Sequence, residues 1–289
     1  MAREKVLVVG LGEVGRSLFE LLRDCGKFEV YGFDLNAEKM RELGLPAVLP
    51  SKVDIMHICI PCVDIEKFVS DVAGYVERFK PKLVIINSTV APGATMELYK
   101  RINGACLVAH SPVRGVHKGI EHMKWELKRW TKYIGGVNEE SAKYAKRHFE
   151  ELELKTKVLK SCLETELAKL FETIYRAWMI VCFQEMHRIS RHFGADFDDV
   201  VDFIEDTHRV RLDRPVLFPG VIGGHCLIQN TELLLRSYDS KLLRFILESN
   251  EKRAVEIGNA SVEEEVEKIK RRVEKLEEEL AKGVAVRDV

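Results

Sequence analysis

The sequence has almost no excess of charge of either sign and contains no long apolar run. Its 45 lysines and arginines balance 46 aspartates and glutamates, which leaves a formal net charge of -1. Such a balance gives no overall attraction to nucleic acid or to an anionic bilayer. No apolar run approaches the ~20 residues that cross a membrane, and residues 1–10 run into a strand-like segment instead of a signal peptide. We therefore expect a cytoplasmic protein that binds neither nucleic acid nor a membrane.

Disulfide and metal-binding patterns are also missing. The seven cysteines are odd in number and widely spread, which suits a reducing compartment better than a disulfide framework. Residues 59–62 have Cys-x-x-Cys spacing, but they end an apolar strand, so thiols without redox chemistry are the better interpretation. No metal motif organises the histidines in or near predicted loops, which are His110, His117, His208 and His225. We expect no metal site.

Strand-like and helix-like segments alternate over the first 160 residues. Short β-branched runs bounded by Gly, Pro, Asn or Asp predict strands at residues 5–10, 28–34, 53–61, 82–90, 106–113 and 132–137. Helical periodicity predicts helices at residues 13–23, 37–43, 65–79, 95–102 and 139–152. This order predicts a doubly wound, Rossmann-like α/β domain, with a parallel sheet covered by helices on both faces.

The pattern after residue 160 is helical. Residues 164–193 carry a wide stripe of large apolar side chains, and a helix of ~30 residues, about 45 Å long, suits a spine between domains or subunits. Residues 196–205 predict another helix, and residues 214–226, with their prolines and glycines, predict a loop. We expect a helical domain for substrate binding and dimerisation at residues 161–258.

The last segment, residues 259–289, has the heptad pattern of a coiled coil. Its apolar residues follow spacings of 4, 3, 4, 3 and 4, at Val262, Val266, Ile269, Val273, Leu276 and Leu280. Opposite charges at flanking positions pair Glu265 with Lys270 and Arg272 with Glu277, which favours a parallel homodimeric coil. The alternative is one amphipathic helix that packs on its own domain.

Three glycines form a G-x-G-x-x-G motif between a predicted strand and a predicted helix. Gly10 permits the tight turn, Gly12 lets backbone N–H groups approach a pyrophosphate, and Gly15 allows close packing of helix on strand. Asp34 ends the next strand, where a carboxylate accepts hydrogen bonds from an adenosine ribose and repels the extra phosphate of NADP. These features predict NAD as the cofactor of residues 1–160. Its expected contacts from this region are Gly10, Gly12, Glu13, Val14, Gly15 and Asp34.

Two further segments carry reactive or polar groups. Residues 87–93 close a strand and present small hydroxyl groups at the carboxyl end of the sheet, where open α/β folds bind ligands. Residues 219–226 place Cys226 beside His225 after flexible glycines. A cation or a helix terminus near such a thiol would activate it as a nucleophile.

These motifs, taken together, resemble the UDP-glucose/GDP-mannose 6-dehydrogenase family of sugar-nucleotide dehydrogenases. The similar strings are VGLGEVG, NSTVAPGAT, HSPVRG, ELAKLFETIYRA and PGVIGGHC, and the resemblance covers most of residues 1–235. It implies a two-step NAD-linked oxidation of a primary alcohol to a carboxylate. In that family a cysteine captures the intermediate aldehyde, a second hydride leaves, and the resulting thioester is hydrolysed.

The resemblance assigns roles to individual residues. Cys226 matches the nucleophile, Lys169 matches the catalytic lysine, and Thr89 matches a threonine near cofactor and substrate. Chemically this is coherent, because an ammonium stabilises an alkoxide and a thiolate attacks a carbonyl. The sequence pattern without the resemblance predicts that Lys169 is a solvent-exposed charge on the helix. The other site residues expected on this basis are Thr173 and Asn230 at catalytic positions, and Pro61, Ser88 and Thr89 at the cofactor.

The sequence departs from the family at three acidic or amide positions. Val113 stands where the family has Glu, Thr173 where it has Asn, and Asn230 where it has Asp. A charged general base is lost in two places, which conflicts with ordinary thioester hydrolysis and leaves a single oxidation open.

The length after Cys226 is a further departure. Only about 60 residues follow it, so we expect a truncated member without the C-terminal domain that grips the nucleotide. A group of basic residues either forms a cationic wall for an anionic substrate or is ordinary solvated surface. Its members are Arg114, His117, Lys118, His208, Arg209, Arg211 and Arg214.

The resulting hypothesis is an NAD-dependent oxidoreductase. Its substrate is sugar-like or anionic, a class that includes nucleotide sugars, and the enzyme oxidises an alcohol or aldehyde group of that substrate. Two alternatives stay open at this point. One is a non-catalytic, regulatory NAD-binding protein. The other is a β-hydroxyacid-dehydrogenase-type enzyme that uses Lys169 only.

Overall fold

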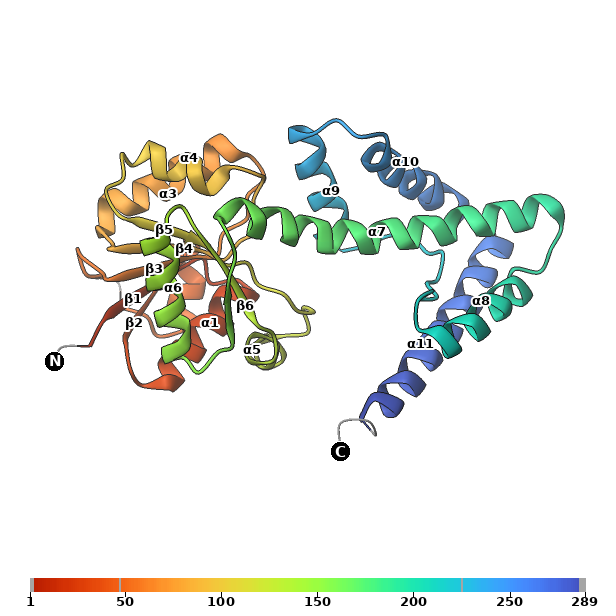
Figure 1. Cartoon of the computed structure of the whole chain (residues 1–289), viewed down its shortest axis with the longest axis horizontal. Coiled ribbons are helices and arrows are strands. Elements are labelled where there is room, and N and C mark those ends of the chain that lie inside the picture. Colours follow the sequence, from red (N-terminus) through yellow and green to blue (C-terminus); the bar gives the residue numbers. More distant parts are fainter. Residues whose placement is uncertain (1–2, 47, 225, 286–289) are drawn as a thin grey trace. The chain divides into compact units, whose positions relative to one another are not determined.

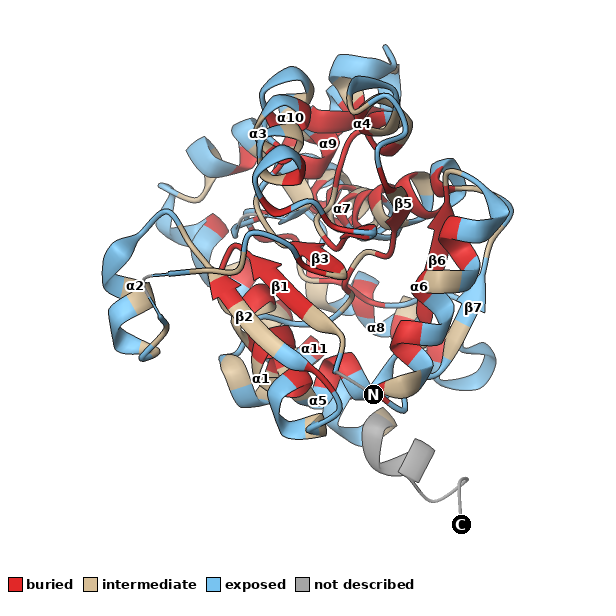
Figure 2. Cartoon of the chain, turned by 90° about the vertical axis from the view of Figure 1, so that its left-hand side faces the viewer, coloured by how far each residue is buried: buried red, intermediate tan, exposed pale blue. Residues whose placement is uncertain are grey.

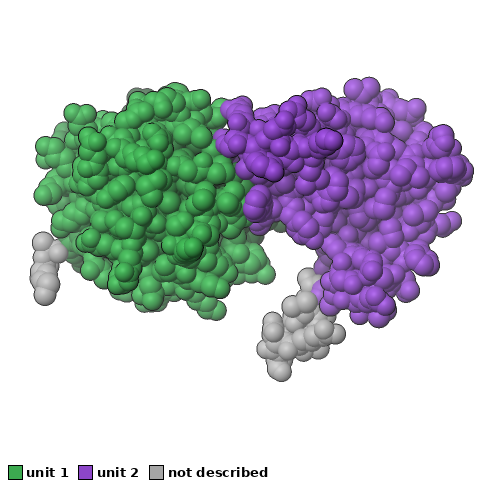
Figure 3. Space-filling view, turned by 45° about the horizontal axis from the view of Figure 1, so that its top comes forward, with its two compact units in different colours: residues 1–170 green, residues 171–289 purple. Residues whose placement is uncertain are grey.

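The chain forms two compact units, residues 1–170 and residues 171–289 (Figure 3). The computed structural model describes residues 3–46, 48–224 and 226–285, with side chains as far as residue 280. We call the two parts the N-terminal unit and the C-terminal unit. The domain boundaries expected at residues 160 and 258 stay predictions.

The N-terminal unit is built around a seven-stranded sheet with the order β2-β1-β3-β4-β5-β6-β7 (Figure 1). Its strands are β1 (Lys5–Val9), β2 (Glu29–Phe33), β3 (Ile55–Ile58), β4 (Leu83–Ile86), β5 (Leu107–His110), β6 (Lys132–Gly136) and β7 (Thr156–Val158). Its helices are α1 (Glu13–Cys25), α2 (Ala37–Glu42), α3 (Ile65–Phe79), α4 (Ala94–Arg101), α5 (Ile120–Arg129) and α6 (Glu139–Glu151).

The central strands are apolar on both sides because helices cover both faces of the sheet (Figure 2). In β1, Val6 and Val8 belong to a core cluster with side chains of α1, α5 and α6. Leu7 and Val9 point the other way, into a cluster with side chains of α3 and α4. The structure thus confirms the expected α/β class and the covering of both faces.

The direction of the last two strands differs from the expected parallel sheet. β6 pairs with β5 in the antiparallel sense, and β7 runs parallel to β6. The chain returns from α5 into β6 at the edge where β5 ends, as the 2.9 Å hydrogen bond from Lys132 Nζ to the Ser111 carbonyl shows. The first residue of β6 therefore lies at the carboxyl edge of the parallel strands.

That edge is where the fold can bind a ligand. β2 and β3 lie on opposite sides of β1, so the chain changes direction across the sheet between β1 and β3. Ligands of open α/β sheets bind outside the carboxyl ends of the strands at such a switch point. Here the two strands lead into Gly10 and Cys59, respectively.

The C-terminal unit is helical. It contains most of α7 (Cys162–Phe193), together with α8 (Phe197–Arg211), α9 (Cys226–Ser237), α10 (Lys241–Glu256) and α11 (Ala260–Ala285). The long helix and the helix after it are confirmed. Helices α5, α9 and α10 and strand β7 were not expected. Within the described residues, no helix is both long and apolar enough to cross a membrane.

The heptad seam of α11 packs inside the C-terminal unit. Ile269, Val273 and Leu276 are at most 4% exposed and share a core cluster with Phe183 of α7 and with side chains of α8. Arg272, expected to pair with Glu277 of a second chain, instead binds Asp198 at 3.0 Å and Glu205 at 2.5 Å. The alternative of an amphipathic helix packed on its own domain therefore describes this segment.

Candidate active site

The turn after β1 has the geometry that its glycines predict. Gly10 adopts φ +87° and donates its N–H to the Phe33 carbonyl at 2.8 Å. A Cβ on Gly10 would lie 2.6 Å from the Cys59 carbonyl oxygen, and one on Gly15 would lie 1.8 Å from the Gly10 oxygen. Side chains are therefore excluded at both positions by the turn itself.

Gly12 differs from the other two glycines because it faces open space. It is the N-cap of α1 with φ -67°, a conformation open to any residue. Apart from Gly12 itself and its two neighbours in the chain, no atom of the described residues lies within 4 Å of the position that a Gly12 Cβ would take. The N–H groups at the start of α1 are thus accessible to an anion, which the helix dipole favours. This cradle fits the pyrophosphate of a dinucleotide.

Asp34 lies beside the same turn. Its Oδ2 accepts the Leu11 N–H at 2.7 Å, and its Oδ1 accepts the Asn36 N–H at 2.8 Å. The Lys39 ammonium lies 3.8 Å from Oδ2. The carboxylate is therefore held at the end of β2 with unused acceptor capacity, as recognition of ribose hydroxyls requires.

Other residues expected at the cofactor have structural contacts of their own. Glu13 accepts hydrogen bonds from the Gly119 N–H at 2.7 Å and lies 3.1 Å from His117 Nδ1, which ties α1 to the segment before α5. Ser88 Oγ donates to the Ile60 carbonyl at 2.5 Å and links the ends of β4 and β3. Glu13 and Ser88 therefore connect neighbouring segments at the edge of the sheet by hydrogen bonds.

The remaining expected contacts lie at the same edge. Val14 packs against the core below the glycine turn, and Pro61 is exposed shortly after β3. Thr89 is partly exposed shortly after β4. Cofactor contacts by these residues stay predictions.

A buried polar network lies behind this edge and was missed by the sequence reasoning. His57 Nδ1 lies 2.8 Å from Asn87 Oδ1, and His57 Nε2 lies 2.9 Å from His148 Nε2. Asn87 Nδ2 donates to the Ser111 carbonyl at 2.9 Å. Burial lowers the pKa of His57 to about 4 and the pKa of His148 well below its usual value, so both rings are neutral at physiological pH.

Lys132 is a second unexpected group at the edge. Its ammonium is buried and donates to the carbonyls of Ser111 at 2.9 Å and Pro112 at 3.2 Å. Burial lowers its pKa to about 7, and the positive charges of Arg114 and Lys169 act in the same direction. A lysine at the start of a strand-like run gave no sequence signal of burial.

The two thiols of residues 59–62 are shielded from solvent to different degrees, since Cys59 is half-buried and Cys62 is buried. Burial raises the pKa of Cys59 to about 12, and it also raises the pKa of Cys62. Thiols with such values are poor nucleophiles. In the described part of the chain, no group of three or more His, Cys, Asp or Glu side chains is arranged to hold a metal ion. His225 lies outside the described residues.

The C-terminal unit places Cys226 at the first position of α9, where it is exposed. Asn230, one turn later, is buried and donates from Nδ2 to Thr173 Oγ1 at 3.0 Å. The structure thus brings together two of the three positions that depart from the family. Neither side chain ionises near neutral pH. The proximity of Cys226 to Lys169 stays a prediction.

Several of the basic residues expected at a cationic wall have partners. The Arg114 guanidinium lies 4.8 Å from the ring centre of Trp130 and 5.1 Å from that of Tyr133. Arg209 pairs with Glu205 and Glu279, and Arg214 pairs with Asp213. These contacts favour a structural role for the three arginines.

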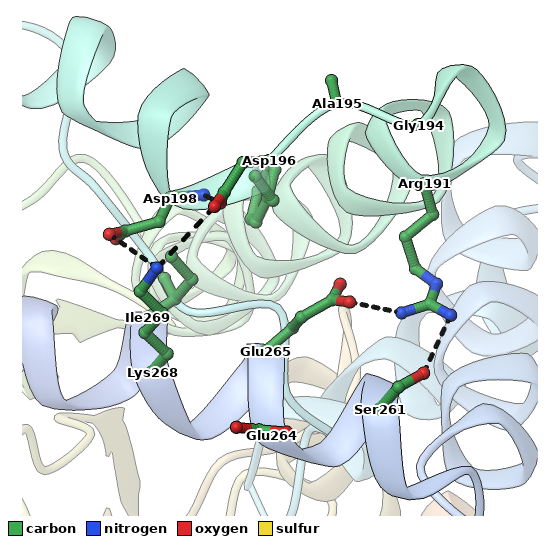
Figure 4. A pocket seen from close by; sticks show the side chains of 11 residues that line it. Arg191, Gly194, Ala195, Asp196, Asp198, Ser261, Glu264, Glu265, Lys268 and Ile269 are labelled. Atoms are coloured by element: carbon green, nitrogen blue, oxygen red, sulfur yellow. Dashed lines mark hydrogen bonds and ion pairs between the residues drawn. The ribbon is translucent and has the colours of Figure 1, made fainter.

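A pocket of about 560 Å³ in the C-terminal unit contains none of the expected site residues (Figure 4). It lies between the α7–α8 connection and α11. Arg191 pairs there with Glu265 at 2.5 Å, and Lys268 pairs with Asp198 at 3.1 Å. These two ion pairs join α11 to α7 and to α8.

Comparison with known proteins gives a consistent result. Residues 163–252 match the sequence profile of the UDP-glucose/GDP-mannose dehydrogenase family, central domain. The UDP-N-acetyl-D-mannosamine dehydrogenase of Methanocaldococcus jannaschii is 28% identical over 312 residues, which cover 94% of this chain and 69% of that protein.

Solved structures show the same fold. The UDP-D-ManNAc dehydrogenase of Pyrococcus horikoshii has a TM-score of 0.71 at 23% identity, over 88% of this chain and 70% of that one. A 3-hydroxyisobutyrate dehydrogenase of Mycobacterium tuberculosis has a TM-score of 0.65 at 16% identity, over 89% of this chain and 95% of that one. The family profile over residues 163–252 and the sequence relatives thus make the chain similar to dehydrogenases of the UDP-glucose/GDP-mannose dehydrogenase family.

Proposed function

We propose that the chain is an NAD-dependent dehydrogenase that oxidises a hydroxyl group of a nucleotide sugar, with Lys169, Cys226 and Thr89 as catalytic residues. The observation that carries the proposal is the open cradle at Gly12 beside the oriented carboxylate of Asp34. UDP-N-acetyl-D-mannosamine is the first substrate to test, because it appears in the names of the sequence relatives.

Two groups of the chain bind two different parts of the cofactor. The start of α1 at Gly12 holds the pyrophosphate, and Asp34 accepts hydrogen bonds from the adenosine ribose. The Asp34 carboxylate repels a 2′-phosphate, so NAD binds in preference to NADP. Bound NAD supplies the hydride acceptor for the oxidation.

Lys169 and Cys226 act on the substrate. The Lys169 ammonium stabilises the alkoxide that forms as the hydroxyl proton leaves. The Cys226 thiolate adds to the aldehyde carbon and gives a hemithioacetal, whose oxidation leaves a thioester on the sulfur. The position of Cys226 at the start of α9 supports this role, because a helix N-terminus stabilises negative charge.

Hydrolysis of that thioester is the slowest step of the reaction. Asn230 and Thr173 are buried and hydrogen-bonded to each other, and Val113 is buried and apolar. None of the three side chains can take a proton from water at neutral pH. The acyl-enzyme on Cys226 therefore accumulates, and turnover after the oxidation is slow.

Rapid-mixing measurement of NADH at 340 nm, with UDP-N-acetyl-D-mannosamine and excess NAD, tests the proposal. We expect a burst of up to two NADH per chain followed by a slow phase, and a covalent adduct at Cys226 by mass spectrometry. Cys226→Ala should lose both the burst of the second NADH and the adduct. One NADH per substrate without an adduct would indicate the hydroxyacid type of enzyme, and NAD binding without NADH would indicate a regulatory protein.

We also propose a homodimer through α7. Several large apolar side chains of this helix are exposed, among them Phe171 at 54%, Tyr175 at 63% and Phe193 at 78%. Exposed apolar patches of this kind mark protein interfaces. Light scattering coupled to size exclusion should give twice the chain mass, and Tyr175→Glu should give the monomer mass.

A further inference from the structure

One buried carboxylate joins α7 to the segment that carries Thr89. Glu166 is fully buried, and its two oxygens accept the Gly93 N–H at 2.7 Å and the Thr95 N–H at 2.9 Å. Gly93 is the N-cap of α4 and has no side chain with which to cap it. Glu166 therefore supplies the cap of α4 from a different helix.

The preceding residue of α7 holds the other end of the same segment. Thr165 Oγ1 lies 2.7 Å from His110 Nδ1, and His110 Nε2 lies 3.0 Å from the Ser88 carbonyl oxygen. A carbonyl only accepts, so Nε2 of the neutral ring carries the proton and Nδ1 is an acceptor. The Thr165 hydroxyl lies within hydrogen-bond distance of this Nδ1 and of the Cys162 carbonyl oxygen, 2.8 Å away, so these two acceptors share its single proton. Burial lowers the pKa of His110 to about 3, which keeps the ring in this neutral form.

Lys169 lies on the same face of α7 as these two anchors. It follows Glu166 by three residues and Thr165 by four, and residues at these spacings share one face of a helix. The anchored segment, residues 88–95, includes Thr89. Both ends of this segment are thus attached to the helical turn before Lys169.

We infer that Thr165 and Glu166 are positioning residues that set the placement of Lys169 relative to Thr89. The inference rests on the proposed function, in which both residues act at the substrate. A displacement of about 1 Å in a catalytic group can lower turnover about 100-fold. Because thioester hydrolysis limits steady-state turnover in that proposal, loss of either anchor should lower the rate of the initial NADH burst and leave the dinucleotide cradle at Gly12 and Asp34 unchanged.

The test compares Glu166→Gln with the wild-type chain. Glutamine keeps the size of the side chain, but its amide nitrogen would face one of the two N–H groups, which removes one hydrogen bond. We expect the rate of the initial NADH burst to fall about 10- to 100-fold, with the Kd for NADH within twofold of the wild-type value. Glu164→Gln is the matched control, because Glu164 is an exposed glutamate of the same helix. It should leave the burst rate unchanged.

A second pair of variants covers the case in which Glu166→Gln does not fold. Thr165→Val removes the hydroxyl contact to His110 at constant size and should lower the rate of the initial NADH burst about 10-fold, and Thr165→Ser should restore it. An unchanged burst rate in the folded anchor variants, or a parallel loss of NADH binding, would overturn this inference alone. A wild-type chain without any turnover would overturn the proposed function and this inference with it.

Discussion

The hydrogen bond from Asn230 Nδ2 to Thr173 Oγ1, 3.0 Å long, joins α9 to α7 one turn after Cys226. Both partners are buried and neutral. The pair therefore fixes the position of α9 and offers no proton acceptor at this place.

Restoring an acid there should speed the slow step. In Asn230→Asp, the new carboxylate can activate water for attack on the thioester, and general-base catalysis is worth about 100-fold or more. We expect the steady-state rate of NADH formation to rise at least 10-fold and the adduct at Cys226 to diminish. Thr173→Val removes the hydrogen bond without adding a base and should not accelerate turnover. Equal acceleration in both variants would refute the assignment.

The buried histidines should make the chain sensitive to acid. His57, His110 and His148 are neutral in the folded state, with pKa values lowered to about 4, to about 3 and well below 6.5, respectively. Because unfolded histidine takes up a proton near pH 6.5, their stabilisation is complete above that pH and is lost as the pH falls toward the folded values.

Urea unfolding at several pH values measures this loss. At pH 5 each histidine should lower the free energy of unfolding by about 2 kcal/mol relative to pH 7.5. His148→Phe should reduce the loss by about one third, and an unfolding free energy that is constant from pH 7.5 to 5 would contradict the neutral network.

Asp34 should determine cofactor preference. Asp34→Asn removes the charge that repels a 2′-phosphate, so the ratio of NADP to NAD dissociation constants should fall about 10-fold or more. Glu38→Gln, an exposed acid in the first turn of α2, is the control and should leave the ratio unchanged. Calorimetric titration of both variants with both cofactors provides the values. The same ratio in Asp34→Asn and the wild-type chain would remove Asp34 from cofactor selection.

The seam of α11 should stabilise the chain from within. Ile269 is 1% exposed in the core cluster with Phe183 and Phe197, so Ile269→Ala should lower the free energy of unfolding by about 2 to 4 kcal/mol. Light scattering should show the same oligomeric state in this variant as in the wild-type chain. Dissociation of the variant without loss of stability would instead indicate a coiled coil between chains.

Local patterns predicted the elements whose signals lie within one segment. The helical periodicity of apolar residues over 65–79 predicts the bounds of α3, and the spacing of the glycines predicts the turn at Gly10. The reversal of β6 was not predictable, because it depends on where the chain runs between Ser111 and Lys132. Heptad spacing on α11 is the same for a partner helix and for the chain's own core.

The candidate site was predictable to the same extent. The cradle at Gly12 and the acid at Asp34 follow from sequence spacing. Glu166 and Lys132 were missed because charged residues in helices and strands normally face solvent. Only the packing of α7 and β6 against the strand ends reveals that both are buried.

Titration of Gly12→Val with NADH tests the central claim, NAD binding at the glycine turn, most directly. Position 12 has a φ that valine adopts, and beyond its two chain neighbours no described atom lies within 4 Å of the new Cβ, so the variant should fold. Valine is a poorer N-cap than glycine, so Tm should fall by a few degrees at most. Its side chain would fill the space of the pyrophosphate. We predict micromolar to submillimolar binding of NADH by the wild-type chain and at least ~100-fold weaker binding by the variant. Equal binding by both chains, or none by the wild-type chain at millimolar NADH, would contradict it.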